Sequence, residues 1–244
     1  ESNFVKIHSN ENIQGKKRLY MTATPRIFGE TAKKQAEEGE VALASMDDLN
    51  TYGKTLFYKG FGWAVENNLL TDYKVVVLMM DERQVSDRVQ KQFSDGAELK
   101  LDDATKMIGC YKALAKVGME TDAEDTSKKN EPMKRALAFC QTIDSSKMFS
   151  SEFAGVVEEY TTNEDISEKN KTDLKVELHH VDGTFNAEER NERLRWLKDD
   201  LDENTCRVLT NARCLSEGVD VPALDAVMFL HPRKSQIDVV QSVG

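Results

Sequence analysis

The stretch "TNARCLSEGVDVP", from Thr210 to Pro222, places a hydroxyl, a glycine and a carboxylate in one short connection after an apolar run. A hydrophobic core requires none of Thr210, Gly218 and Asp220. A hydroxyl can bind a phosphate, a glycine lets the backbone approach a ligand closely, and a carboxylate accepts hydrogen bonds from hydroxyl groups. The stretch is therefore consistent with a site for phosphate and ribose. The alternative is that Thr210 and Asp220 only cap local turns.

Further hydroxyl groups stand at two other junctions. Thr22 and Thr24 lie in "MTATP", where two hydroxyls on a tight turn can exchange partners or simply bond to their own backbone. Thr142 lies in "AFCQTIDSS", between an expected strand and an expected helix, where backbone amides at the helix N-terminus favour phosphate. Asp144 is the alternative cap of that helix.

Two sequence patterns resemble a phosphate loop and a metal site, but neither meets the requirements of such a site. "YGKT" resembles the end of a phosphate loop, but Asp48 occupies the position of the first glycine and a strand-like run follows. His179 and His180 are adjacent in a strand-like run, so their side chains face opposite sides of a sheet and suit joint metal binding poorly. We therefore predict no metal site, and the scattered cysteines indicate reduced thiols.

The elements that must position these residues follow a regular order. In the second half of the chain, apolar strand-like runs alternate with helical patterns, which predicts a parallel sheet with helices on both faces. Ligands bind such sheets at the carboxyl ends of the strands. The expected strands cover residues 17–25, 54–61, 73–80, 135–140, 174–181, 206–210 and 224–230, and the expected helices cover 84–93, 101–117, 144–160, 187–201 and the residues from 235 onward.

The composition restricts the class of protein. The formal net charge is −10, which argues against nucleic-acid binding through bulk positive potential but leaves room for a narrow track of amides and a few basic side chains. No apolar stretch approaches the roughly 18 residues that span a bilayer, and the first residues do not form a signal peptide. We expect a cytoplasmic location and no membrane partner.

Four motifs in order carry a family resemblance. "MTATP", "AFCQTIDSS", "LTNARCLSEGVDVP" and "QSVG" resemble motifs III, IV, V and the start of VI of superfamily 2 helicases and DNA translocases, which include the DEAD/DEAH-box helicases. "GFGWAVENNLLTDYKVVVL" and "LHPRKSQIDVVQ" resemble the motor subunits of type I and single-chain restriction enzymes. The resemblance implies an α/β, RecA-like, three-layer fold in which two lobes enclose ATP.

The resemblance also implies a domain arrangement. Residues 1–44 would form the end of the first RecA-like lobe, with motif III, and the inter-lobe linker. Residues 45–244 would form the second lobe, with a helical insertion at about 84–130 and an end inside motif VI. The chain would then be a fragment, inactive by itself, that binds neither ATP nor Mg²⁺ until the first lobe completes the site.

Site residues follow from matching the motifs position by position. Gly218, Asp220 and Gln241 would bind ATP, with Asp220 accepting from the ribose hydroxyls and the amide of Gln241 acting as a catalytic group at the nucleotide phosphates or their water. A helical glutamine exposed to solvent is the alternative for Gln241.

The hydroxyl-bearing residues would serve the nucleic acid. Thr22 and Thr24 would couple the nucleotide site to the nucleic-acid track, and Thr142 and Thr210 would contact that track. The function that this implies is an ATP-dependent DNA helicase or translocase of a restriction-modification or phage-defence enzyme. Its partners would be DNA, the first lobe and, as further candidates, fused nuclease or methyltransferase modules. The alternatives are an RNA helicase lobe and a non-catalytic RecA-like interaction module.

Overall fold

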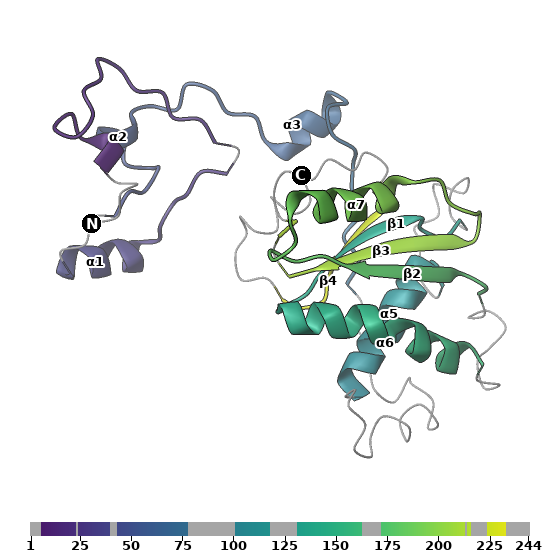
Figure 1. The fold of residues 1–244 in the computed structure, drawn as a ribbon. Helices are drawn as coiled ribbons and strands as arrows, with labels where there is room; N and C mark the ends of the chain where they lie inside the picture. Colours follow the sequence, from purple (N-terminus) through teal and green to yellow (C-terminus); the bar gives the residue numbers. More distant parts are fainter. Residues whose placement is uncertain are drawn as a thin grey trace. The chain divides into compact units, whose positions relative to one another are not determined.

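The computed structural model describes residues 6–22, 24–39, 43–77, 101–117, 131–162, 172–212, 214–215 and 224–232. The chain divides into two compact units, Glu1–Lys74 and Val75–Gly244 (Figure 1). The division falls after Lys74, and the predicted boundary between lobes at residue 44 stays a prediction.

The second unit is built on a parallel sheet, as predicted. Its described strands are β1 (Arg135–Phe139), β2 (Lys175–His180), β3 (Thr205–Asn211) and β4 (Ala226–Phe229). They pair in the order β2-β3-β1-β4, so the strands with the most buried side chains, β1 and β3, lie at the centre. Central strands covered on both faces are expected to be almost continuously apolar, which explains the sequence "RALAF" of β1.

Helices cover both faces of this sheet. On one side lies α7 (Ala187–Lys198); on the other lie α5 (Leu101–Leu114) and α6 (Ile143–Thr161) (Figure 1). Side chains alternate along a strand, so Ala136 and Ala138 of β1 pack under α5 and α6. Leu137 and Phe139 point to the α7 side. The predicted three-layer α/β fold is confirmed.

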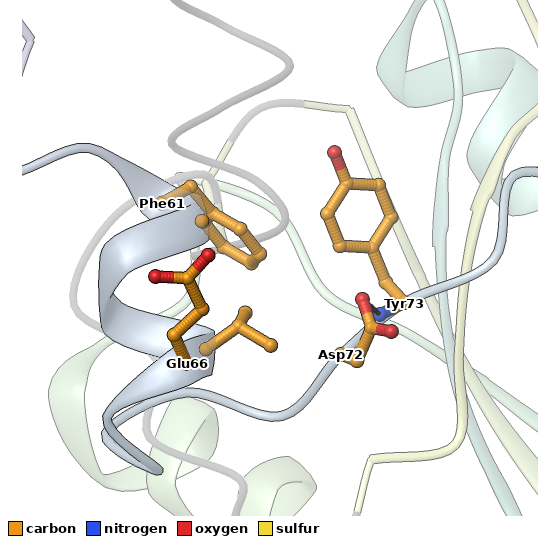
Figure 2. A pocket seen from close by; sticks show the side chains of 6 residues that line it. Phe61, Glu66, Asp72 and Tyr73 are labelled. Carbon is orange, nitrogen blue, oxygen red and sulfur yellow. Dashed lines mark hydrogen bonds between the residues drawn. The ribbon is translucent and has the colours of Figure 1, made fainter.

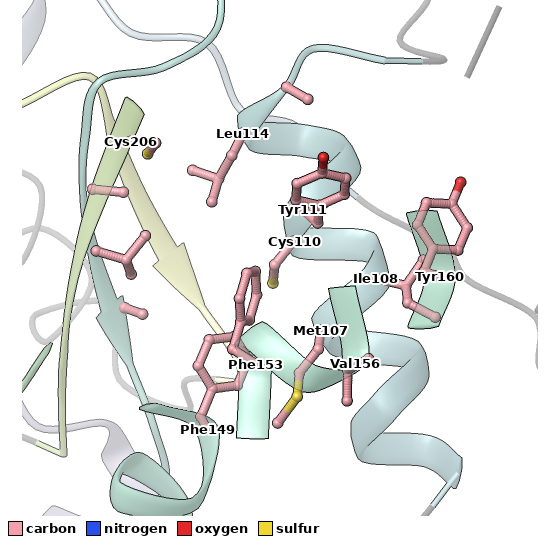
Figure 3. Packing of buried hydrophobic residues seen from close by; sticks show 14 of the residues in the cluster. Met107, Ile108, Cys110, Tyr111, Leu114, Phe149, Phe153, Val156, Tyr160 and Cys206 are labelled. Atoms are coloured by element: carbon pink, nitrogen blue, oxygen red, sulfur yellow. The ribbon is translucent and has the colours of Figure 1, made fainter. Parts of the chain in front are cut away.

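Helix α5 belongs to the core of the second unit. Met107, Ile108 and Leu114 are at most 1% exposed and pack with α6 against the sheet (Figure 3). The hydroxyl of Tyr111 donates a hydrogen bond of 3.2 Å to the carbonyl of Thr172, just before β2. The predicted insertion at about 84–130 stays a prediction, because residues 84–100 and 118–130 lie outside the described part of the chain.

Three cysteines lie inside the same packed layer. Cys110 of α5, Cys140 after β1 and Cys206 of β3 are all buried. Burial in apolar surroundings raises the pKa of the Cys110 and Cys206 thiols to about 12. These thiols therefore pack as small apolar side chains.

The first unit contains short helices and irregular chain. Its described helices are η1 (Lys6–His8), α1 (Glu30–Glu38), α2 (Leu49–Tyr52) and α3 (Phe61–Glu66). Gly53 caps the end of α2 with a φ of +73°, which accounts for the glycine of "YGKT" without a phosphate loop. None of the described helices of the chain is long and apolar enough to cross a membrane.

The strands predicted in the first unit are not formed in its described residues. The described residues of the runs at 17–25 and 54–61 form no strand, and neither do residues 73–77, which cross into the second unit; Met21, Phe57 and Val77 are 77–84% exposed. A strand needs a neighbouring strand to satisfy its backbone groups, and the described residues of this unit supply none. Residues 78–80 of the last run lie outside the described chain.

Candidate functional site

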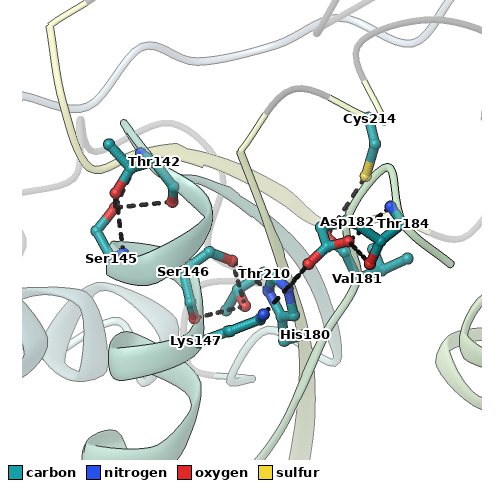
Figure 4. Close-up of polar contacts among 10 residues, drawn as sticks. All are labelled: Thr142, Ser145, Ser146, Lys147, His180, Val181, Asp182, Thr184, Thr210 and Cys214. Carbon is teal, nitrogen blue, oxygen red and sulfur yellow. Dashed lines mark hydrogen bonds and ion pairs between the residues drawn. The ribbon is translucent and has the colours of Figure 1, made fainter.

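The carboxyl ends of β1, β2 and β3 open into three connections that carry polar side chains (Figure 4). Thr142 follows β1, Asp182 follows β2, and Cys214 follows β3. All belong to the second unit. Because this is the edge where wound parallel sheets bind ligands, it is the candidate site.

Thr142 is the N-cap of α6. Its hydroxyl accepts a hydrogen bond of 3.0 Å from the amide of Ser145, whose hydroxyl in turn accepts 3.0 Å from the amide of Thr142. This reciprocal capping box shows that Thr142, and not Asp144, begins the helix. Thr142 is exposed at the end of a long helix, where anions are favoured. Its contact with nucleic acid stays a prediction.

Thr210 does not face the surface. It is 0% exposed, and its hydroxyl donates to the carbonyl of Ser146 at 3.1 Å and accepts from the Ser146 hydroxyl at 2.9 Å. The reason is that β3 continues to Asn211, which leaves Thr210 inside the strand with its side chain directed under α6. This hydroxyl is therefore engaged within the unit, and the contact of Thr210 with nucleic acid stays a prediction.

The hydrogen-bond network continues from Ser146 to the loop after β2. The Ser146 hydroxyl lies 2.7 Å from Nδ1 of His180, and Nε2 of His180 lies 2.9 Å from Oδ2 of Asp182. The other oxygen, Oδ1 of Asp182, accepts from the Thr184 hydroxyl at 2.6 Å and from the Thr184 amide at 2.8 Å. Lys147 approaches Asp182 to 3.7 Å.

These bonds determine the charge of Asp182. Its side chain is only 1% exposed, yet hydrogen bonds from Thr184 and His180 hold the pKa of its carboxyl well below the ordinary value. Our reading of the motifs missed Asp182. The available signal was a strand followed by Asp-Gly-Thr, in which an aspartate bonds to the backbone two residues on.

His179 and His180 face opposite sides of the sheet, as predicted. His180 points toward α6, whereas the ring of His179 packs edge-on against Trp196 of α7, with 4.2 Å between ring centroids. Burial and the nearby charge of Arg193 lower the pKa of His179. Within the described residues, no group of three His, Cys, Asp or Glu side chains is placed to hold a metal.

Thr22 and Thr24 lie in the first unit. The Thr22 hydroxyl accepts from the Thr24 amide at 3.1 Å and lies 3.2 Å from the Thr24 carbonyl. This is the local turn that we considered as the alternative, and the coupling role of these residues stays a prediction. Gly218, Asp220 and Gln241 lie outside the described residues.

The first unit also contains an open hollow of about 510 Å³ beside α3 (Figure 2). The rings of Phe61 and Tyr73 meet edge to face with their centroids 5.0 Å apart. The lining residues are Phe61, Gly62, Val65, Glu66, Asp72 and Tyr73. Two carboxylates and no basic side chain line this hollow, so it is unsuited to phosphate.

Comparison with known proteins decides the family. Residues 116–244, just over half of the chain, match the helicase conserved C-terminal domain. The chain belongs to the superfamily 2 helicases. The parallel sheet of the second unit is thus the second RecA-like lobe of a helicase, and we call Val75–Gly244 the helicase lobe.

The helicase chain is also similar to a solved structure, the "ATP-dependent Type ISP restriction-modification enzyme LlaBIII bound to DNA". The two are 40% identical with a TM-score of 0.77, and the match covers 98% of this chain and 15% of that chain. The helicase chain therefore spans about 15% of the length of that enzyme. A comparison with curated proteins gave no match.

Proposed function

We propose that this helicase chain is part of an ATP-dependent motor that moves along DNA in a restriction-modification enzyme. The observation that carries the proposal is the similarity, over 98% of the chain and at 40% identity, to a restriction-modification enzyme described as ATP-dependent and bound to DNA. In this proposal, the motifs "AFCQTIDSS" and "LTNARCLSEGVDVP" would carry the contacts with DNA and ATP.

In this proposal the helicase lobe supplies one wall of the ATP site. Asp220 would accept hydrogen bonds from the ribose, the backbone at Gly218 would approach the nucleotide, and Gln241 would direct its amide at the phosphates or the attacking water. The first lobe would supply the remaining contacts together with Mg²⁺. Catalysis of phosphoryl transfer depends on such positioning and on stabilisation of charge, so neither lobe would turn over ATP alone.

DNA would run along the carboxyl edge of the sheet. The exposed N-terminus of α6 at Thr142 offers amides and a partial positive charge to a phosphate. Contacts of this kind carry no sequence information, which suits a motor that must step over any sequence. The net charge of −10 supports a local track in preference to a broad basic surface.

The test is ATP turnover by the intact enzyme, measured with no nucleic acid, with double-stranded DNA and with RNA. We expect stimulation by DNA. Asp220→Ala should raise the KM for ATP about tenfold, as expected for hydrogen bonds to a carboxylate, and Gln241→Ala should lower kcat about 100-fold. Asp200→Ala, at an exposed position beyond α7, is the matched control.

Two outcomes would contradict this proposal. If Asp220→Ala and Gln241→Ala both retain DNA-stimulated turnover at the wild-type level, the assigned ATP site is wrong. If RNA stimulates turnover and DNA does not, the RNA helicase alternative is correct.

A further inference from the structure

A buried row of polar side chains crosses the interface between α6 and the sheet of the helicase lobe (Figure 4). It runs from Thr210 through Ser146 and His180 to Asp182, with contacts of 2.9, 2.7 and 2.9 Å. Thr210 and Ser146 are 0% exposed and Asp182 is 1% exposed. Apolar side chains would fill this space without any need for matching partners, so the row requires an explanation of its own.

The row has the residue types of a hydrolase triad, but it cannot act as one. Ser146 is completely buried in the first turns of α6, and its hydroxyl already contacts both Thr210 and His180. A nucleophile must reach a substrate carbonyl, whereas this hydroxyl faces only other protein groups. The row therefore serves to position the elements that carry it.

The row can be satisfied in two proton arrangements, and Nε2–H of His180 donates to Asp182 in both. In one, Nδ1 carries no proton and accepts from Ser146, while Thr210 donates to the carbonyl of Ser146. In the other, His180 carries a second proton, on Nδ1, and donates it to Ser146; Ser146 then donates to Thr210, and Thr210 donates to the carbonyl of Ser146. A fully satisfied buried network permits one alignment of its elements and penalises all others.

The elements that the row aligns carry the proposed functional contacts. The Ser146 amide donates to the carbonyl of Thr142 at 3.1 Å, so a shift of Ser146 moves the exposed cap of α6. On the other side, the Val181 amide donates to the Thr210 carbonyl at 3.0 Å, and the Cys214 thiol lies 3.4 Å from the Val181 carbonyl. Cys214 begins the connection that leads to Asp220.

We infer that Ser146, His180 and Asp182 form a positioning element that holds the α6 cap in register with the connection after β3, and thereby sets how tightly the lobe holds DNA. This inference rests on the proposed function. The three side chains would act through Thr142 and the backbone, without touching DNA or ATP.

The test uses the intact enzyme with Ser146→Ala, His180→Gln and Asp182→Asn. Each should raise the DNA concentration for half-maximal ATP turnover about tenfold, the effect of one lost hydrogen bond in a coupled row, while kcat at saturating DNA stays within about twofold. The matched control is His179→Gln, which changes the adjacent residue on the opposite face of β2. It should leave the DNA concentration dependence unchanged.

A double-mutant cycle separates positioning from general loss of stability. Ser146→Ala combined with His180→Gln should weaken the response to DNA no more than either change alone, because both break the same row. Ser146→Ala removes a single oxygen atom, so it can decide the question by itself if His180→Gln fails to fold.

The outcomes distinguish this inference from the proposed function. If DNA does not stimulate ATP turnover by the wild-type enzyme, the proposed function is wrong. A DNA-stimulated enzyme in which Ser146→Ala leaves the DNA dependence unchanged, or in which His179→Gln weakens it equally, would overturn only the positioning role.

Discussion

Asp182 is a buried carboxylate whose two oxygens are both hydrogen-bonded. Thr184 satisfies one oxygen and His180 the other, and Lys147 lies nearby. A buried charge without such partners would be strongly unfavourable. The low pKa that results means that the folded protein binds the proton of Asp182 more weakly than the unfolded chain does.

The stability that Asp182 contributes should therefore depend on pH. Because its folded-state pKa is depressed, the contribution is fully present above the unfolded value of 3.8 and is lost progressively as the pH falls below it. At pH 7, Asp182→Asn should lower the free energy of unfolding by about 1–3 kcal/mol. Urea unfolding between pH 7 and pH 3 measures the difference from wild type.

That difference should stay constant from pH 7 to about pH 5 and shrink below about pH 4. Asp200→Asn, at an exposed position, should match wild type throughout. A difference for Asp182→Asn that grows toward acid would contradict the assignment.

At the same scale, the site residues show what the sequence could predict. The place of Thr142 follows from the order of an apolar run and a helical pattern, which locates a strand-to-helix junction. The burial of Thr210 depends on where β3 ends, and a shift of one residue decides which face a side chain occupies. The row through His180 joins residues of α6, β2 and β3 that are far apart in the sequence, so no local pattern indicates it.

Among the elements, α5 shows how far a helical pattern can predict packing. Its residues fall within the predicted helical insertion. Its buried residues, which include Ala104, Met107, Ile108, Tyr111 and Leu114, nevertheless repeat at three- and four-residue intervals. Such spacing is typical of a helix packed on a core. The strands predicted in the first unit are not formed, because pairing depends on partners that an apolar run does not reveal.

If α5 is part of the core, truncating its buried side chains must destabilise the helicase lobe. Met107→Ala should lower the free energy of unfolding by about 2–5 kcal/mol, because it leaves a cavity in a closely packed layer. Lys106→Ala, one position away, removes exposed ion pairs with Asp102 and Asp103 and should cost at most about 1 kcal/mol. Chemical denaturation of both variants measures this; equal losses would contradict a place for α5 in the core.

At the scale of the whole molecule, the two units differ in what stabilises them. Both hydrophobic clusters found in the described residues lie in the helicase lobe. The described part of the first unit contains no buried hydrophobic side chain; it is joined instead by a group of rings, His8, Tyr20 and Tyr52, with centroids 4.7–5.3 Å apart. Units this small that bury little apolar surface rarely fold alone.

Residues 75–244 expressed alone should therefore unfold in one cooperative transition, and residues 1–74 alone should show none. The physical reason is that apolar burial drives folding and is concentrated in one unit. Circular dichroism during urea titration, compared with the whole chain, is the measurement. A sharp transition in residues 1–74 would show that this unit stabilises itself by other means.

The buried cysteines have a practical consequence for this lobe. Alkylating reagents attack the thiolate, and thiols with a pKa of about 12 inside a packed layer offer almost none at neutral pH. Maleimide can thus reach Cys110 or Cys206 only when the layer opens. Labelling of Cys110 requires α5 to separate from the sheet, and labelling of Cys206 requires β3 to become exposed. The two labelling rates, measured by mass spectrometry in native buffer, therefore give the order in which α5 and β3 open.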